Sequence, residues 1–137
     1  MMSVWMLVLG CTEVSSSDRA LPTFPTITLR ANQKDYVVEY ACSPHEVALG
    51  LRYRKLGLDE GMLLCSEGDT SLSMQKMKSP ISAAFLSKEK EILAIRSFSV
   101  SALDYPVDRS VRWVWEMPKG WFSQKKIVPG IHVEGIP

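Results

Sequence analysis

The pattern of residues after Gly61 limits the fold of this chain more than any other feature. From that point short apolar runs alternate with turn-forming residues at close intervals, and the 3.6-residue period of a helix is absent. Strands are expected at 26–30, 36–41, 62–65, 71–75, 81–86, 92–100, 111–117 and 131–134, hairpin loops at 67–69 and 88–90, and one helical turn at 121–125. The pattern therefore predicts a fold built mainly of β-strands.

One helix is expected between the second and the third of these strands. Ser43 is a typical N-cap, Pro44 suits the first helical position, and Glu46 stands where a capping box places its acidic residue. Basic residues at 54–55 suit the last turn, and Gly57 is expected to end the helix. The sequence thus predicts a compact antiparallel β sandwich or open barrel with one early inserted α-helix, a mainly β fold of the α+β class.

Length and composition agree with one globular domain at residues 26–137. The chain has 137 residues, of which 46% are hydrophobic and 23% are charged. Its formal net charge is +1, and no segment has the concentrated positive charge of a nucleic-acid-binding surface. We therefore expect no nucleic-acid partner.

The amino terminus carries a candidate membrane anchor. Residues 4–9 are an apolar run too short to cross a bilayer, and the sequence from Leu7 to Cys11 resembles the lipobox of bacterial lipoproteins. This resemblance implies a signal segment at 1–10, lipidation of Cys11 and a polar tether at 11–25. The protein is then expected in the cell envelope as a periplasmic or outer-membrane lipoprotein. The alternative is a buried first strand with an incidental cysteine.

Two further cysteines, Cys42 and Cys65, are an even pair that could form a disulfide in an oxidising compartment. Two separate buried thiols are the alternative, and the frequency with which cysteine is buried favours it. A Cys2His2 metal site formed with His45 and His132 has no standard spacing, so we expect no metal.

Several short motifs occur together in one order along the chain. They are Gly50-Leu51-Arg52-Tyr53-Arg54, Gly61-Met62-Leu63-Leu64, Met74 six residues before Pro80, Phe85, Arg112 to Gly120, and Ile127-Val128-Pro129-Gly130. In this order the motifs resemble a bacterial and archaeal family, domain of unknown function 192, over roughly residues 37–133. The resemblance implies a compact β-rich fold, frequent secretion or membrane tethering, and no established activity.

The chain departs from the family pattern at several polar positions. The departures are Leu49, Arg52, Ser73, Lys76, Met77 and Ser82. They argue that any activity shared by the family is altered or lost here. Arg54 and Glu116 match the pattern, and we expect them to form a buried structural pair rather than a catalytic one.

Three tryptophans suggest a binding face. Alternation along a strand places Trp113 and Trp115 on one face, and Trp121 follows closely. Such a face is usually core, and Met74 would be filler near the large rings. The alternative is a ligand platform that includes all four residues.

No familiar catalytic motif, cofactor signature or phosphate-binding loop is present. The first functional hypothesis is therefore a non-catalytic envelope module that binds a small molecule, a glycan or another envelope protein. The second is a small envelope hydrolase that uses Glu116 or the loop with Asp104 and Asp108; it requires two titratable groups in one cleft. The third is a structural accessory, which requires a filled core and no cleft.

Overall fold

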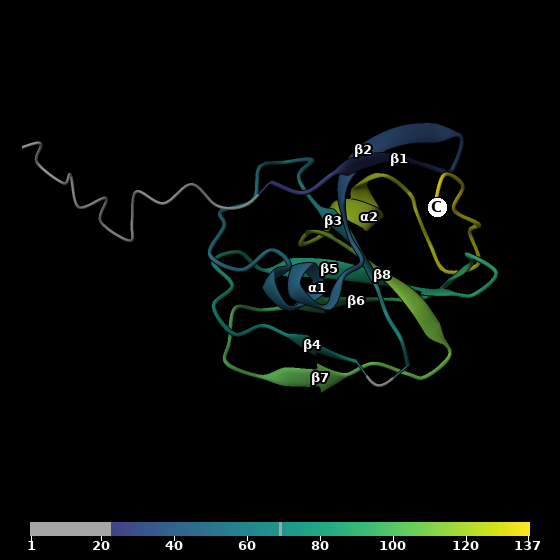
Figure 1. Ribbon diagram of the computed structural model, residues 1–137. Coiled ribbons are helices and arrows are strands. Elements are labelled where there is room, and N and C mark those ends of the chain that lie inside the picture. The colour runs from purple at the N-terminus through teal and green to yellow at the C-terminus, as the bar shows by residue number, and fades with distance from the viewer. Residues whose placement is uncertain (1–22, 69) are drawn as a thin grey trace, which may run out of the picture.

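The computed structural model describes residues 23–68 and 70–137 (Figure 1). Its strands are β1 (Thr26–Ala31), β2 (Lys34–Ala41), β3 (Met62–Cys65), β4 (Ser71–Ser73), β5 (Ile81–Ser87), β6 (Ile92–Phe98), β7 (Asp104–Pro106) and β8 (Val111–Pro118), and its helices are α1 (Pro44–Leu49) and α2 (Trp121–Gln124). The predicted mainly β fold with an early helix is confirmed.

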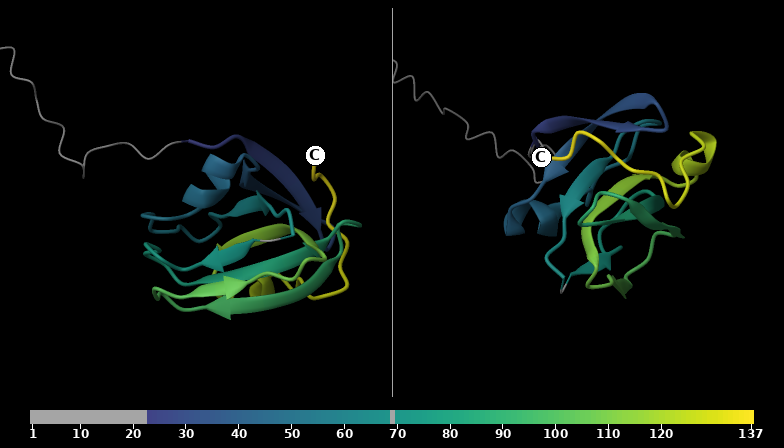
Figure 2. Two further views of the ribbon diagram at one scale, coloured as in Figure 1. Left: turned by 60° about the horizontal axis from the view of Figure 1, so that its bottom comes forward. Right: turned by 90° about the vertical axis from the view of Figure 1, so that its right-hand side faces the viewer.

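Six strands form one sheet in the order β1-β2-β3-β8-β5-β6, and β4 pairs with β7 in a separate two-stranded sheet. All neighbours are antiparallel except β2 and β3, which run parallel because α1 and its following loop lie between them. The sheet is not closed into a barrel. Instead the C-terminal segment bridges both edge strands, through Glu134 to Arg30 of β1 and through Ile131 to Ile92 of β6 (Figure 2).

The large sheet is covered on both faces (Figure 1). One face packs against α1 and the β4–β7 sheet, with Met62, Ala83 and Val114 in its core. The other face packs against α2 and the C-terminal segment, with Leu63 and Trp115 in its core. Alternating residues of β3 and β8 therefore supply both cores, as the period of a strand requires.

Helix α1 begins as predicted and ends early. Ser43 caps Glu46 through a complete capping box, and Pro44 occupies the first turn. The helix stops at Leu49, because Gly50 adopts a φ of +49° while its N–H still bonds to Glu46. The prediction that the helix continues through residues 54–55 to Gly57 is wrong. Gly50 ends it about two turns after the cap.

Three other elements differ from the sequence prediction. Strand β7 was not expected, and β3 and β4 lie in different sheets instead of pairing as a hairpin. Residues 131–134 form only isolated bridges, because successive amides there bond alternately to Lys90 and Arg30 rather than to one strand. Residue 69, the predicted signal segment at 1–10, Cys11 and the predicted tether up to residue 22 lie outside the described residues. Near the end of the predicted tether, Phe24 is buried in the core.

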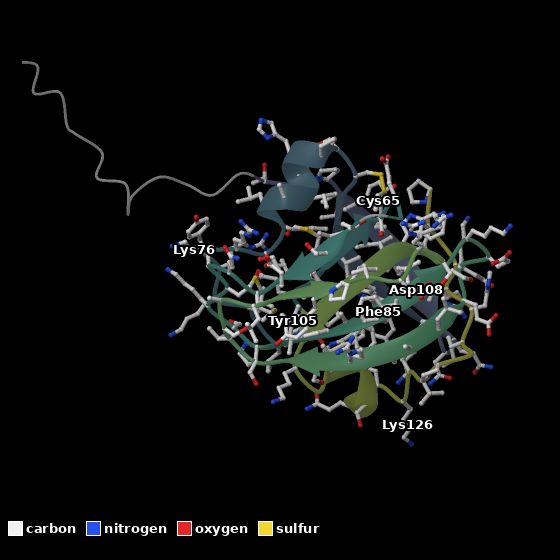
Figure 3. All side chains as sticks on the ribbon, turned by 90° about the horizontal axis from the view of Figure 1, so that it is seen from below. Cys65, Lys76, Phe85, Tyr105, Asp108 and Lys126 are labelled. Atoms are coloured by element: carbon white, nitrogen blue, oxygen red, sulfur yellow. A yellow bond between two sulfur atoms is a disulfide. The ribbon has the colours of Figure 1, made fainter. Side chains whose placement is uncertain are left out.

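Cys42 and Cys65 form a disulfide, visible as the yellow bond beside the Cys65 label in Figure 3. The parallel pairing of β2 and β3 brings the ends of the two strands together, with 4.7 Å between the two Cα atoms. The expectation of two separate thiols is therefore wrong. The bond joins Cys42, the first residue after β2, to Cys65, the last residue of β3.

Candidate functional site

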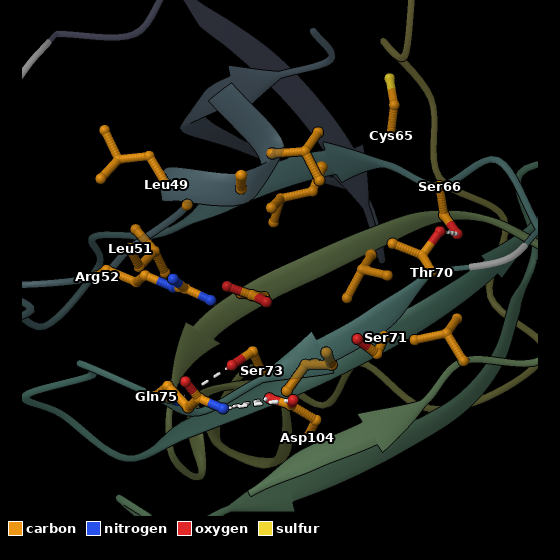
Figure 4. A pocket seen from close by; sticks show the side chains of 18 of the residues that line it. Leu49, Leu51, Arg52, Cys65, Ser66, Thr70, Ser71, Ser73, Gln75 and Asp104 are labelled. Carbon is orange, nitrogen blue, oxygen red and sulfur yellow. Dashed lines mark hydrogen bonds between the residues drawn. The ribbon is translucent and has the colours of Figure 1, made fainter. Parts of the chain in front are cut away.

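A cleft of about 420 Å³ opens between α1 and the β4–β7 sheet (Figure 4). Its floor is formed by β3 and β8, one wall by α1 with the loop after it, and the other wall by β4 and β7. The lining residues are Pro44, Val47, Ala48, Leu49, Gly50, Leu51, Arg52, Leu64, Cys65, Ser66, Thr70, Ser71, Leu72, Ser73, Gln75, Met77, Asp104, Val107, Val114 and Glu116. The volume lies in the range of sites for small molecules.

Glu116 is the only acidic residue in the buried part of β8 and it lines the floor of the cleft. In the sheet it lies between Met62 of β3 and Ala83 of β5, both of which are fully buried. Its residue exposure is 8%, and no hydrogen bond or ion pair joins its carboxyl to another residue in the described part of the chain. Burial raises the pKa of Glu116 to about 7.

The two walls of the cleft differ in chemistry. The α1 side and the floor contribute aliphatic side chains, among them Val47, Leu51 and Val114. The opposite side contributes hydroxyl groups from Ser66, Thr70, Ser71 and Ser73. The same side also contributes Leu72 and Val107, so a ligand in this space would contact aliphatic groups on the α1 side and both hydroxyl and aliphatic groups on the β4–β7 side.

Several polar side chains of the cleft are ordered by neighbours. The hydroxyls of Ser66 and Thr70 are 2.9 Å apart, and the Gln75 amide donates to both oxygens of Asp104 at 3.4 Å. Arg52 extends into the cleft from the loop after α1 (Figure 4) and forms no ion pair with a described residue. Among the described charged residues of the cleft, Glu116 and Arg52 thus have no hydrogen-bond or ion-pair partner for their side chains, whereas Asp104 accepts from Gln75.

The expected pair of Arg54 and Glu116 does not form. The Arg54 guanidinium instead donates to Glu39 at 2.5 Å and to Glu60 at 3.2 Å. Burial opposes the charge of Arg54, but these two carboxylates outweigh it and raise its pKa. Arg54 lies over β2, whereas Glu116 lies two strands away on β8, beyond Met62.

The predicted tryptophan face lies in the core on the opposite side of the sheet. Trp115 and Trp121 are 0% and 2% exposed and contact each other at 5.5 Å between ring centroids, and Trp113 packs beside them half-buried. The Trp121 indole donates to Asp59 at 2.8 Å and lowers the pKa of that carboxyl. Met74 is fully buried on the other face. None of these four residues lines the cleft.

The two aspartates predicted to serve a hydrolase do not lie in the same cleft. Asp104 lines the cleft, but Asp108 does not. Asp108 accepts hydrogen bonds from the Ser110 hydroxyl at 2.6 Å and the Ser110 amide at 2.9 Å, which lower its pKa. His45 and His132 are exposed, and the disulfide removes Cys42 and Cys65 as thiolate ligands. The described residues hold no cluster of three or more metal-binding side chains.

Sequence reasoning missed the hydroxyl wall, because Ser66, Thr70, Ser71 and Ser73 have no motif that separates them from ordinary turn residues. The signal that was present is Glu116, an acidic residue inside an otherwise apolar strand segment. A carboxylate there is rare unless it has a partner or a role.

Comparison with known structures supports the same fold. A crystal structure described as a candidate transcription regulator from Sinorhizobium meliloti 1021 is 23% identical, covers 85% of this chain and 98% of its own, and has a TM-score of 0.74. A protein of unknown function from Novosphingobium aromaticivorans DSM 12444 is 21% identical, covers 88% and 96%, and has a TM-score of 0.68. At these identities the likeness shows the fold alone. Comparison with curated proteins found no match.

The family comparison covers most of the chain. Residues 27–135 match DUF192, a family described as "Uncharacterized ACR". The matched range contains every strand of the large sheet, both helices and the whole described cleft, except for the first residue of β1. This chain is therefore a member of the DUF192 family.

Proposed function

We propose that this protein is a binding module that holds a small ligand in the cleft over Glu116. One observation carries the proposal. Glu116 is 8% exposed, its carboxyl has no protein partner among the described residues, and it lines an open cleft of about 420 Å³. A buried polar group without a partner is costly, so its retention is best explained by a ligand that supplies the missing contact.

The departures from the family pattern support a ligand specific to this chain. Leu49, Arg52, Ser73 and Met77 all line the cleft. This chain therefore departs from the family pattern at four positions where a ligand in the cleft would make contact. A structural accessory, by contrast, would have no use for an open cleft.

The module is proposed to work in the cell envelope, tethered through a lipid on Cys11. The lipobox-like sequence supports this location, although it lies outside the described residues. The disulfide between Cys42 and Cys65 also favours an oxidising compartment. Within the described residues no helix is long and apolar enough to span a membrane.

A hydrolase is the second candidate, favoured by one observation. Glu116 and Asp104 line the same cleft, and a pKa of about 7 suits a general acid at neutral pH. Turnover of 4-nitrophenyl acetate or a 4-nitrophenyl glycoside that is lost in Glu116→Gln would establish this candidate in place of the binding module.

The binding proposal is tested by amide NMR with four probes, namely hexylamine, hexan-1-ol, hexanoate and N-acetylglucosamine. At least one is expected to shift amides of cleft residues in a saturable manner. Ser71→Trp, which fills the cleft from β4, should abolish the shifts, whereas Ser99→Trp on the exposed loop after β6 should preserve them. No saturable shift with any probe, or equal binding by Ser71→Trp, would overturn the proposal.

A further inference from the structure

The chemistry of the cleft narrows the class of ligand. We propose that the cleft selects a primary ammonium group on an aliphatic body, with the ammonium seated on Glu116. This inference rests on the proposed binding function and adds the ligand's charge and shape.

The first step is the position of the carboxyl. Glu116 lies at the floor of the cleft, nine-tenths buried, between Met62 and Ala83 of the neighbouring strands. Its carboxyl has no donor among the described residues, so a ligand in the cleft can supply one. An ammonium group supplies both the donor and the opposite charge, and charge-assisted hydrogen bonds are the stronger kind.

The second step is the balance of the other charges that face the cleft. Arg52 comes from the loop after α1 and Asp104 from β7. These two charges have opposite signs, while β3, β4 and α1 place no further charged side chain on the cleft. The sign of the interior is therefore set by Glu116.

The third step is the kind of cation. No aromatic ring occurs among the described residues that line the cleft. Quaternary ammonium groups are usually held by aromatic cages. A primary ammonium instead donates three hydrogen bonds, and the hydroxyl oxygens of Ser66, Thr70 and Ser73 are acceptors in the same cleft.

The fourth step is the body of the ligand. Val47, Leu51 and Val114 present aliphatic surface on the α1 side and the floor. An alkyl chain is complementary to this surface, and burial of its CH₂ groups adds affinity without any directional requirement.

The test compares three probes that share one alkyl body, using titration calorimetry at about pH 8. Hexylamine, hexan-1-ol and hexanoate differ only in their head group, and hexylamine is expected to bind at least about tenfold more tightly than the other two. Equal or tighter binding of hexan-1-ol or hexanoate would overturn the ammonium preference. The cleft would then remain a binding site, and the proposed function would survive.

The dependence of hexylamine binding on pH provides a second readout that needs no variant. Hexylamine stays charged across the neutral range. Glu116 has a pKa of about 7 in the free protein, so affinity should fall about tenfold from about pH 8 to about pH 6 as the carboxyl takes up a proton. Unchanged or increased affinity at the lower pH would contradict the pairing.

Two variants assign the effect to one carboxyl. Glu116→Gln keeps the shape of the side chain and should weaken hexylamine binding at least about tenfold while removing the pH dependence. Asp104→Asn is the matched control at the exposed wall, and its effect should stay below about fivefold. The reverse order of effects would place the ammonium at Asp104 and overturn the proposal. Absence of binding by every probe would overturn the proposed function as well.

Discussion

Glu116 combines two properties that rarely occur together in a folded core. It is ionisable, and it has no protein partner among the described residues. Arg54 shows the usual arrangement, since its guanidinium is held by Glu39 and Glu60 at the side of the same sheet. The contrast between these two residues separates a structural ion pair from a candidate ligand contact.

The raised pKa of Glu116 makes stability depend on pH. Between the ordinary value of 4.5 and about 7 the folded state binds a proton that the unfolded state has released, so the free energy of unfolding falls as pH rises. At about 1.4 kcal/mol per pKa unit, the wild type should lose about 3 kcal/mol relative to Glu116→Gln across this range. Urea unfolding of both proteins at several pH values measures the difference. A difference that does not change with pH would contradict the burial of an ionisable group.

The sequence predicted some residues well and others poorly. Alternation correctly placed Trp113 and Trp115 on the face of β8 opposite Val114 and Glu116. It could not identify the partner of Arg54, because that depends on how the loop after α1 crosses β2. Local patterns report which face a residue occupies, whereas pairing depends on tertiary contacts.

At the scale of elements, β3 is the strand on which the cleft depends. It pairs with β2 on one side and β8 on the other, and its last residue forms the disulfide. Its start is equally constrained, because a Cβ at Gly61 would overlap the Glu116 carbonyl oxygen and the Met117 sulfur. Gly61 therefore allows the backbone before β3 to approach β8 more closely than a residue with a side chain would.

Gly61→Ala should destabilise the fold by at least about 2 kcal/mol, because backbone atoms of β8 would have to move. Gly57→Ala is the matched control, since its added Cβ would lie 4.0 Å from the Glu60 Cβ, an ordinary contact. That variant should remain within about 1 kcal/mol of wild type. Thermal unfolding compares them, and equal melting of the two variants would contradict the close approach of β3 and β8.

The disulfide should stabilise the fold by about 3 kcal/mol, because it closes a loop with a sequence separation of 23. Reduction of the wild type should lower the urea midpoint accordingly. The double variant Cys42→Ala, Cys65→Ala should match the reduced protein and should not respond to reductant. Similar midpoints for oxidised and reduced wild type would contradict the stabilising role of this bond.

The ends of the helices and strands show which features can be predicted from neighbouring residues alone. The capping box at Ser43 predicted the start of α1 correctly, because capping is a contact within one turn. The end was missed because Gly50 turns the chain so that Leu51 is buried in the core. Strand β7 was missed because its only partner is β4, which is distant in sequence.

At the scale of the whole molecule, the cleft joins parts of the chain that are far apart in sequence. Its floor contains β3 and β8, and its walls contain α1, β4 and β7. No local pattern could predict that Glu116, Arg52 and Asp104 line the same cleft. The family resemblance, which the match over residues 27–135 confirms, did predict the mainly β fold that the structure shows.

The tether proposed for the whole protein can be tested separately from the cleft. Full-length protein expressed in a bacterial host should partition into the detergent phase of a Triton X-114 extraction, because its lipid chains hold it in membranes. Cys11→Ser should move it to the aqueous phase. Recovery of Cys11→Ser in the detergent phase would contradict anchoring through this cysteine.

The most direct measurement for the cleft is the titration of Glu116 itself, followed by the ¹³C shift of its side-chain carboxyl. A buried carboxyl without a protein partner should titrate with a midpoint of about 7, and saturating hexylamine should lower that midpoint. A midpoint near the ordinary 4.5 in the free protein would show that this carboxyl is solvated or paired, and it would contradict the assignment of Glu116 as the ligand contact.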